Sequence, residues 1–320
     1  MSARIRQSVI ATVAILAGLG ALSISGLGAG SVGPEATPSA NVPQLTQGPS
    51  SSSTPGTSSS SKKVVEFGPS DTQAQFVSLM NDMSVDVIEM AAGTYRGWHV
   101  DFVINRAPRP LLVRPAPGAA VVWDDTGGTS GDSLFYVGSE TAQSEVTNYI
   151  TFDPAGTGGS FTVQNYALGQ VGLIDTFWVD HVAFNGFHTS GLTGVAGGQL
   201  SWTVYVSSDG VHSGSNITFD DWTVGPSANR NVGGLTTYHD PNAHGLTALR
   251  WTISGASSAM ALWGTASGID VEGWRITGCK YAVSTDGVAA GVLKNNTSTG
   301  STNRPIIRLP MVNGSGNSWH

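Results

Sequence analysis

Ionisable side chains recur at one place in a repeated pattern of apolar residues. Asp180 and His181 follow one apolar pair, Asp220 and Asp221 follow a second, and Arg250 follows a third. If these segments stack as neighbouring strands, equivalent positions lie about 4.8 Å apart and the five side chains form one cluster. Carboxylates at that spacing suit the cleavage of a glycosidic bond, and their oxygens are also ligands for Ca²⁺.

The cluster suits two reaction types. In a hydrolase, Asp180 and Asp220 act as the general acid and its partner, and their mutual repulsion raises one pKa into the working range. In a lyase, the aspartates hold Ca²⁺ against a uronate while Arg250 takes a proton from carbon 5. His181 or Arg250 then binds a substrate carboxylate or hydroxyl, and Trp178 stacks on a sugar ring. The alternative is a structural role, because an aspartate after a strand often binds its own backbone in a turn.

Three further residues are candidates for substrate binding: Tyr238, His239 and His244. They lie on the longest insertion between repeats, and loops often carry binding residues. The single cysteine, Cys279, excludes an internal disulfide framework and a cysteine-based zinc site. No residue is assigned as a metal ligand, and Ca²⁺ is the one cofactor that the acidic cluster could use.

Apolar residues recur at relative positions 1, 3, 6 and 8 of each repeat. The copies are Phe177, Val179, Val182, Phe184; Ile217, Phe219, Trp222, Val224; Leu246, Ala248, Trp251, Ile253; and Ile269, Val271, Trp274, Ile276. A weaker copy starts near Ala290 or Gly291 and places Asn295 or Asn296 at the tryptophan position. Positions 1 and 3 point inward along one strand, and the step from 3 to 6 turns a corner. The pattern predicts Trp222, Trp251 and Trp274 stacked at one corner.

Such repeats hide their apolar face by stacking on one another. Residues 150–153 recur literally at 217–220, so Asp153 joins the column that the aspartates form. Long gaps between repeats predict inserted loops over residues 187–198 and 227–244. The uneven repeat length and the absence of hairpin dipeptides favour a solenoid over a β-sandwich.

The start of this region resembles a known fold family. Ser70 and Gln73 fit a capping box, and apolar residues at helical spacing predict a helix over residues 71–83. Residues 85–97, VDVIEMAAGTYRG, and the apolar run 110–122 follow. Together they resemble the N-terminal cap and first coils of right-handed parallel β-helix proteins with the pectate-lyase-like fold. The resemblance implies an all-β, single-stranded, right-handed parallel β-helix with a short N-terminal capping helix.

Composition excludes several classes of protein. The chain has 42 glycines in 320 residues, and only 12% of its residues are charged. So few charges, together with nine tryptophans, argue against a disordered chain or a coiled coil. A net charge of −7 without a basic cluster argues against nucleic-acid binding.

Three zones divide the chain. Residues 1–34 carry a basic start and an apolar stretch, the layout of a signal peptide or of an uncleaved N-terminal anchor. Residues 35–63 are rich in Ser, Thr, Pro and Gly, a composition typical of a disordered linker. Residues 64–320 are the β-helix domain. This layout predicts a secreted or cell-surface protein, with membrane contact only through the N-terminal segment.

Two functions fit these features. One is an extracellular carbohydrate-active enzyme, either a polysaccharide lyase or a glycoside hydrolase. The other is a non-catalytic β-helix that binds a cell-surface glycan or a protein. The negative net charge favours the second function, because it repels polyuronates unless Ca²⁺ or a local basic patch intervenes.

Overall fold

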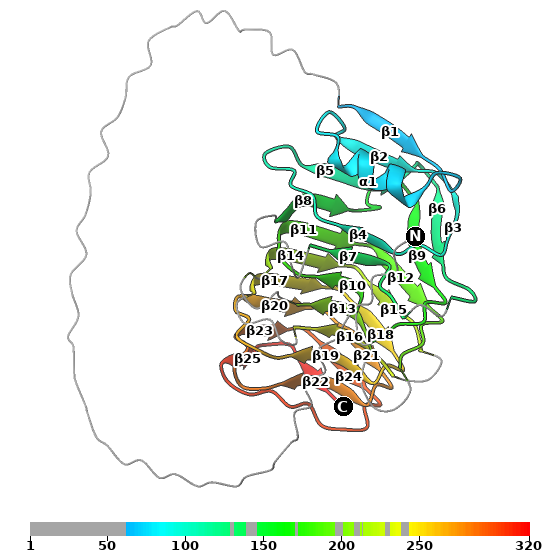
Figure 1. The fold of residues 1–320 in the computed structure, drawn as a ribbon. Helices are drawn as coiled ribbons and strands as arrows, with labels where there is room; N and C mark the ends of the chain where they lie inside the picture. The colour runs from blue at the N-terminus through cyan, green and yellow to red at the C-terminus, as the bar shows by residue number, and fades with distance from the viewer. Residues whose placement is uncertain are drawn as a thin grey trace, which may run out of the picture. The chain divides into compact units, whose positions relative to one another are not determined.

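A computed structural model describes residues 62–128, 131–138, 146–169, 172–195, 201–207, 212, 214–227, 231–237 and 243–320. Within these residues the strands form three sheets, and neighbouring strands in each sheet run parallel (Figure 1). The chain visits sheet A, then sheet B, then sheet C, and repeats this circuit along the stack. The protein is therefore a parallel β-helix, as the sequence predicts.

Each sheet is a row of short strands that follow one another along the stack. Sheet A contains β1 (Val64–Phe67), β2 (Val87–Met90), β5 (Leu111–Pro115), β8 (Thr147–Phe152), β11 (Val179–Asn185), β14 (Ser215–Asp220), β17 (His244–Leu249), β20 (Ile269–Glu272), β23 (Gly291–Lys294) and β25 (Met311–Asn313). Sheet B contains β3 (Gly93–Arg96), β6 (Ala120–Asp124), β9 (Ser160–Gln164), β12 (Phe187–Ser190), β15 (Thr223–Val224), β18 (Thr252–Ser254), β21 (Arg275–Thr277), β24 (Thr297–Thr299) and β26 (Ser318–Trp319). Sheet C contains β4 (Val100–Phe102), β7 (Phe135–Val137), β10 (Gly172–Thr176), β13 (Ser201–Val206), β16 (Val232–Thr236), β19 (Ser258–Leu262) and β22 (Tyr281–Thr285).

The predicted tryptophan stack is confirmed. Trp222, Trp251 and Trp274 are fully buried at the corner between sheets A and B. Ring centroids of Trp222 and Trp251 lie 5.1 Å apart, and those of Trp251 and Trp274 lie 4.6 Å apart with planes 4° from parallel. Asn296 continues the column and accepts a 2.9 Å hydrogen bond from the backbone N–H of Trp274. The repeat that begins at Gly291 is thus the correct one of the two predicted starts.

The predicted register of the repeat that starts at Phe177 is wrong. Val182 and Phe184, rather than Phe177 and Val179, pair with Ile217 and Phe219. The cause is a left-handed residue, His181, whose φ of 52° produces a local step inside β11. That step has the same 1, 3, 6, 8 spacing as the corner between sheets A and B, so the sequence pattern does not separate the two.

The helix is shorter than predicted and has a different cap. Helix α1 spans Gln73–Asn81, within the predicted 71–83. Thr72, not Ser70, begins the capping box: its hydroxyl accepts from the Gln75 N–H at 3.2 Å, and the Gln75 side chain accepts from the Thr72 N–H at 2.7 Å. Phe76 and Met80 are buried, and α1 lies at the β1–β2 end of the stack (Figure 1).

The two predicted inserted loops contain strands. Residues 187–198 include β12 of sheet B, and residues 227–244 include β16 of sheet C. The sequence of β16, VGGLT, lacks the apolar template, yet all five of its residues are buried. Residues 1–34 and the linker up to residue 61 lie outside the described residues. The part of the chain that is described contains no helix long and apolar enough to cross a membrane.

The tryptophan stack should carry much of the stability of the central coils. We expect Trp251→Ala to lower the free energy of unfolding by about 3–5 kcal/mol, because it removes a buried indole between two others. Denaturant unfolding measures this loss. Trp319→Ala, at a half-buried position near the C-terminus, is the control and should cost less. Equal losses of unfolding free energy in the two variants would show that the stacked Trp251 stabilises the fold no more than Trp319 does.

The corrected helix cap is testable in the same way. We expect Thr72→Ala to lower the free energy of unfolding by about 1 kcal/mol, because it leaves a helix N–H without its acceptor. Ser70→Ala, two residues earlier on an exposed position, should change it little. A larger effect at Ser70 would restore the cap that the sequence suggested.

Candidate functional site

The structure divides the predicted cluster between the two ends of the sheet A strands. Asp180 pairs with Ser215 near the start of β11, whereas Asp220 at the end of β14 pairs with Asn185. The predicted stacking of Asp180 on Asp220 is therefore wrong. Five residues separate Asp180 from Asn185 along β11, which corresponds to roughly 16 Å of strand. Asp220, Asp221 and Arg250 remain together.

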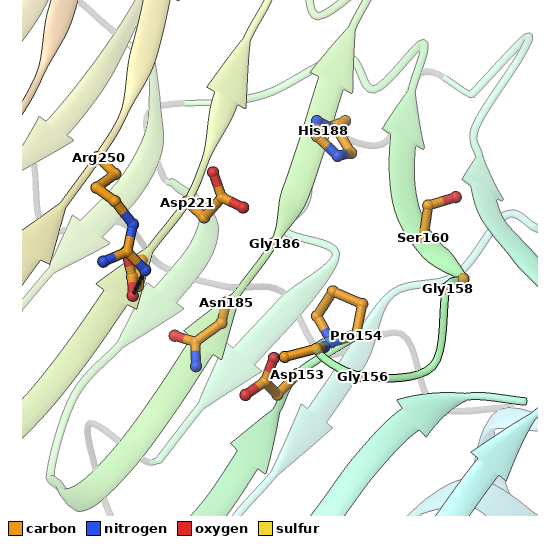
Figure 2. Close-up of a pocket in the computed structure, with 13 residues that line it drawn as sticks. Asp153, Pro154, Gly156, Gly158, Ser160, Asn185, Gly186, His188, Asp221 and Arg250 are labelled. Atoms are coloured by element: carbon orange, nitrogen blue, oxygen red, sulfur yellow. Dashed lines mark hydrogen bonds and ion pairs between the residues drawn. The ribbon is translucent and has the colours of Figure 1, made fainter. Parts of the chain in front are cut away.

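A pocket of about 420 Å³ lies where the chain turns from sheet A to sheet B (Figure 2). We call it the corner pocket. It is lined by Asp153, Pro154, Ala155, Gly156, Gly158, Gly159, Ser160, Asn185, Gly186, His188, Asp220, Asp221 and Arg250. Three consecutive coils supply its acidic and amide side chains, from the ends of β8, β11 and β14.

The backbone of the corner sets which side chains reach the pocket. Gly186, Asp221 and Arg250 adopt left-handed φ values of 67°, 56° and 55°, respectively, at the turn from sheet A to sheet B. The residue before each turn then follows the last inward residue of its strand and faces outward. At Gly186 only glycine fits, since a Cβ there would lie 2.4 Å from the ring of Pro154.

Asp220 is the most unusual ionisable group in the corner pocket. One of its oxygens accepts from the Arg250 guanidinium, while the other is buried and has no hydrogen-bond partner among the described residues. Burial raises the pKa of Asp220, and the charges of Asp221 and Asp153 add to that rise, while Arg250 and the backbone N–H of Asp221 oppose it. The Asp220 side chain is 18% exposed and that of Arg250 is 63% exposed.

A second unpartnered oxygen lies beside it. Asn185 pairs with Asp220 on the adjacent strand, and its side-chain oxygen is buried without a hydrogen-bond partner among the described residues. Such groups cost free energy unless something else supplies the hydrogen bond. Both oxygens are shielded from solvent, so neither faces the corner pocket openly in this side-chain arrangement.

Asp153 and Asp220 occupy equivalent positions two strands apart, with Asn185 between them. Two inter-strand spacings place their backbones about 9.6 Å apart, which leaves their carboxyl groups to approach each other by side-chain rotation. Carboxyl groups about 6.5–9.5 Å apart leave room for a water molecule between one acid and the sugar, which is the arrangement of inverting glycosidases. One oxygen of Asp153 accepts a 2.8 Å hydrogen bond from the Ala155 N–H, which fixes the side chain.

Sequence reasoning assigned no role to four polar residues that line the corner pocket: Asp153, Ser160, Asn185 and His188. The literal repeat of residues 150–153 at 217–220 did place Asp153 in the column of Asp220, so a signal for it exists. Ser160 and His188 belong to sheet B, on β9 and β12. No pattern in the sequence links them to the aspartates.

Asp180 and His181 belong to a separate group. The His181 Nδ1 lies 2.8 Å from one Asp180 oxygen, and the other accepts from Ser215 at 2.6 Å and Asn216 at 2.9 Å. Burial raises the pKa of Asp180, but the hydrogen bonds from Ser215 and Asn216 outweigh it, so the pKa lies below its usual value. The His181 ring stacks on Tyr149 at 4.9 Å.

The remaining predicted residues lie elsewhere or outside the described part. Trp178 is half-buried and stacks on His212 at 3.9 Å, and His244 contacts the Ser267 hydroxyl through Nδ1. Tyr238 and His239 lie outside the described residues. Among the residues that were described, no group of three or more His, Cys, Asp or Glu side chains could hold a metal ion.

Comparisons with known proteins add little to this geometry. No protein-family model matches the chain, and no curated protein matches its sequence. Among solved structures, the catalytic domain of a GH87 alpha-1,3-glucanase in complex with tetrasaccharides matches with a TM-score of 0.20 and 11% identity. The match covers 80% of this chain and 69% of that one. A TM-score this low is insufficient to transfer a substrate or mechanism.

The two aspartates should respond to pH with opposite signs. The raised pKa of Asp220 means that its charge destabilises the folded protein above the unfolded pKa of about 3.9, and that this penalty vanishes below it. We therefore expect Asp220→Asn to melt at or above the wild-type temperature at pH 7, and this advantage to shrink toward pH 3.5. The exposed Arg250 loses little when its partner is neutral.

Asp180→Asn is the matched control. The lowered pKa of Asp180 means that its charge stabilises the folded protein above the unfolded pKa, and that this contribution is lost as the pH falls through the folded value. We expect this variant to melt below the wild type at pH 7, with a gap that narrows in acid. Thermal melts from pH 3.5 to 7 measure the melting temperatures of both variants. Changes of the same sign at pH 7 in Asp220→Asn and Asp180→Asn would contradict the opposite pKa shifts of the two aspartates.

Proposed function

We propose that the protein is an extracellular glycoside hydrolase that cleaves a neutral polysaccharide in the corner pocket. The observation that carries this proposal is the pairing of Asp220, whose pKa is raised by burial, with Asp153 two coils away. The extracellular location rests on residues 1–34, which have the composition of a signal or anchor segment.

Asp220 is assigned as the general acid. A raised pKa increases the fraction of the carboxyl that keeps a proton near neutral pH, which it can give to the leaving glycosidic oxygen. Arg250 holds one oxygen of Asp220 and the other is buried, so the side chain has to turn to bring its proton to the substrate.

Asp153 is assigned as the general base. It lies on the far side of Asn185 from Asp220, at a separation that suits activation of a water molecule on the opposite face of the sugar. Its hydrogen bond from the Ala155 N–H holds the side chain in place. The Asn185 amide is placed to bind a sugar hydroxyl between the two carboxyl groups. This arrangement gives hydrolysis with inversion of the anomeric centre.

The charges of the pocket favour a neutral substrate. Three aspartates and one arginine line it, so an anionic uronate would be repelled. A lyase reaction through Arg250 is less well supported, because the guanidinium is already engaged in an ion pair with Asp220. The proposal therefore favours hydrolysis over elimination.

Turnover of a polysaccharide panel tests the assignment. Neutral and uronic polymers are incubated with the protein, with and without Ca²⁺, and both new reducing ends and unsaturated products are followed. We expect reducing ends from a neutral polymer and no unsaturated product. Asp220→Asn and Asp153→Asn should each lower kcat by about 10²–10⁴-fold, because each removes a proton-transfer group.

Glu272→Gln is the control, since Glu272 lies in the same column of sheet A beyond the pocket and accepts from Asn295. It should keep wild-type turnover. Unsaturated products would replace the hydrolase by a lyase. Retention of a glycan without any product would instead support a non-catalytic binding protein.

A further inference from the structure

A second groove lies on the outer face of sheet A, beside the corner pocket. It encloses about 400 Å³ and is lined by His181, Val182, Ala183, Asn216, Thr218, Gly245 and Thr247. We call it the sheet A groove. It crosses β11, β14 and β17, and two of these strands, β11 and β14, end in residues of the corner pocket.

Only small side chains lie between the two depressions. Ala183, Thr218 and Thr247 face outward at paired positions on the three strands. Two residues further along, Asn185 and Asp220 line the corner pocket. Outward residues of one strand are about 6.6 Å apart, so the floor of one depression continues into the other.

The far end of the sheet A groove is walled by a fixed aromatic ring. His181 is 49% exposed, and its ring lies nearly parallel to that of Tyr149, with planes 8° apart. Tyr149 covers one face of the imidazole, and His181 is one of the residues that line the groove. Asp180 holds Nδ1, and Ser215 and Asn216 hold Asp180 in turn. A ring held in this way loses little entropy on binding a ligand.

We infer that the outer face of sheet A binds several consecutive sugars of one polysaccharide chain. The chain lies over β11, β14 and β17 and runs in the strand direction into the corner pocket. The inference rests on the proposed function and adds the path by which the polysaccharide reaches the corner pocket. Four residues separate His181 from Asn185, or roughly 13 Å of strand, which exceeds the size of a single sugar ring.

The chemistry of the floor fits a neutral glycan. Threonine hydroxyls and the Asn216 amide can exchange hydrogen bonds with sugar hydroxyls, and Ala183 leaves room for the ring above it. The nearby carboxylate, Asp180, is already bound by three side chains. His181 then provides a stacking surface for the sugar most distant from the cleaved bond.

Comparison of a polymer with a short chromogenic glycoside of the same sugar tests this. We expect His181→Ala to lower the ratio of kcat/KM on the polymer to kcat/KM on the short substrate by about tenfold, through a higher polymer KM. Ala183→Phe, which fills the path on an outward position, should lower the same ratio. Melting temperatures check that both variants are folded, and His320→Ala, at the exposed C-terminus, is the control and should leave the ratio at the wild-type value.

Binding supplies a second readout that does not need turnover. In affinity gels that contain the polymer, Asp220→Asn should be retarded, and the double variant Asp220→Asn with His181→Ala should be retarded less. If both the kcat/KM ratios and the retardation stay unchanged, the sheet A path is wrong. A loss of turnover in Asp220→Asn would in that case still support the corner pocket as the site of cleavage. Full turnover in Asp220→Asn would instead overturn the proposed function.

Discussion

The hydrogen bonds between parallel strands are the constraint on which the rest of the structure depends. They place each coil about 4.8 Å from the next, so one position of the repeat becomes a column along the stack. Inside, this builds the column of Trp222, Trp251 and Trp274. Outside, it brings Asp153, Asn185 and Asp220 to one corner. The same spacing thus produces both the core and the candidate site.

Much of the fold could be predicted from the sequence, because a repeated apolar pattern needs repeated geometry. The tryptophan column follows from that pattern alone, whereas the structure decides that Asn296, rather than Asn295, continues it. The register of β11 could not be predicted, since His181 within the strand and Asp221 at the corner both adopt left-handed φ values after the same apolar spacing. Only pairing with the neighbouring strands distinguishes the two. Sheet C was not predicted either, because its strands, such as β16, do not share the template.

The candidate site, like the fold, could be predicted only in part. Asp220, Asp221 and Arg250 lie together as predicted, because their repeats were aligned correctly. Asp180 and His181 belong instead to the outer face of sheet A, because the sequence pattern aligned their repeat five residues out of register. The raised pKa of Asp220 depends on burial, and burial is a property of the folded corner that no local spacing encodes. Charged columns on a solenoid therefore need a verified register before roles are assigned to them.

In the proposed reaction, two carboxyl groups two coils apart cleave a glycosidic bond, and a water molecule lies between one of them and the sugar. Proton NMR of the first product, recorded before mutarotation, measures the configuration of the new anomeric centre directly. We expect the configuration opposite to that of the substrate linkage. Retention of configuration would contradict it, because retention requires a nucleophile about one strand spacing from the acid rather than two.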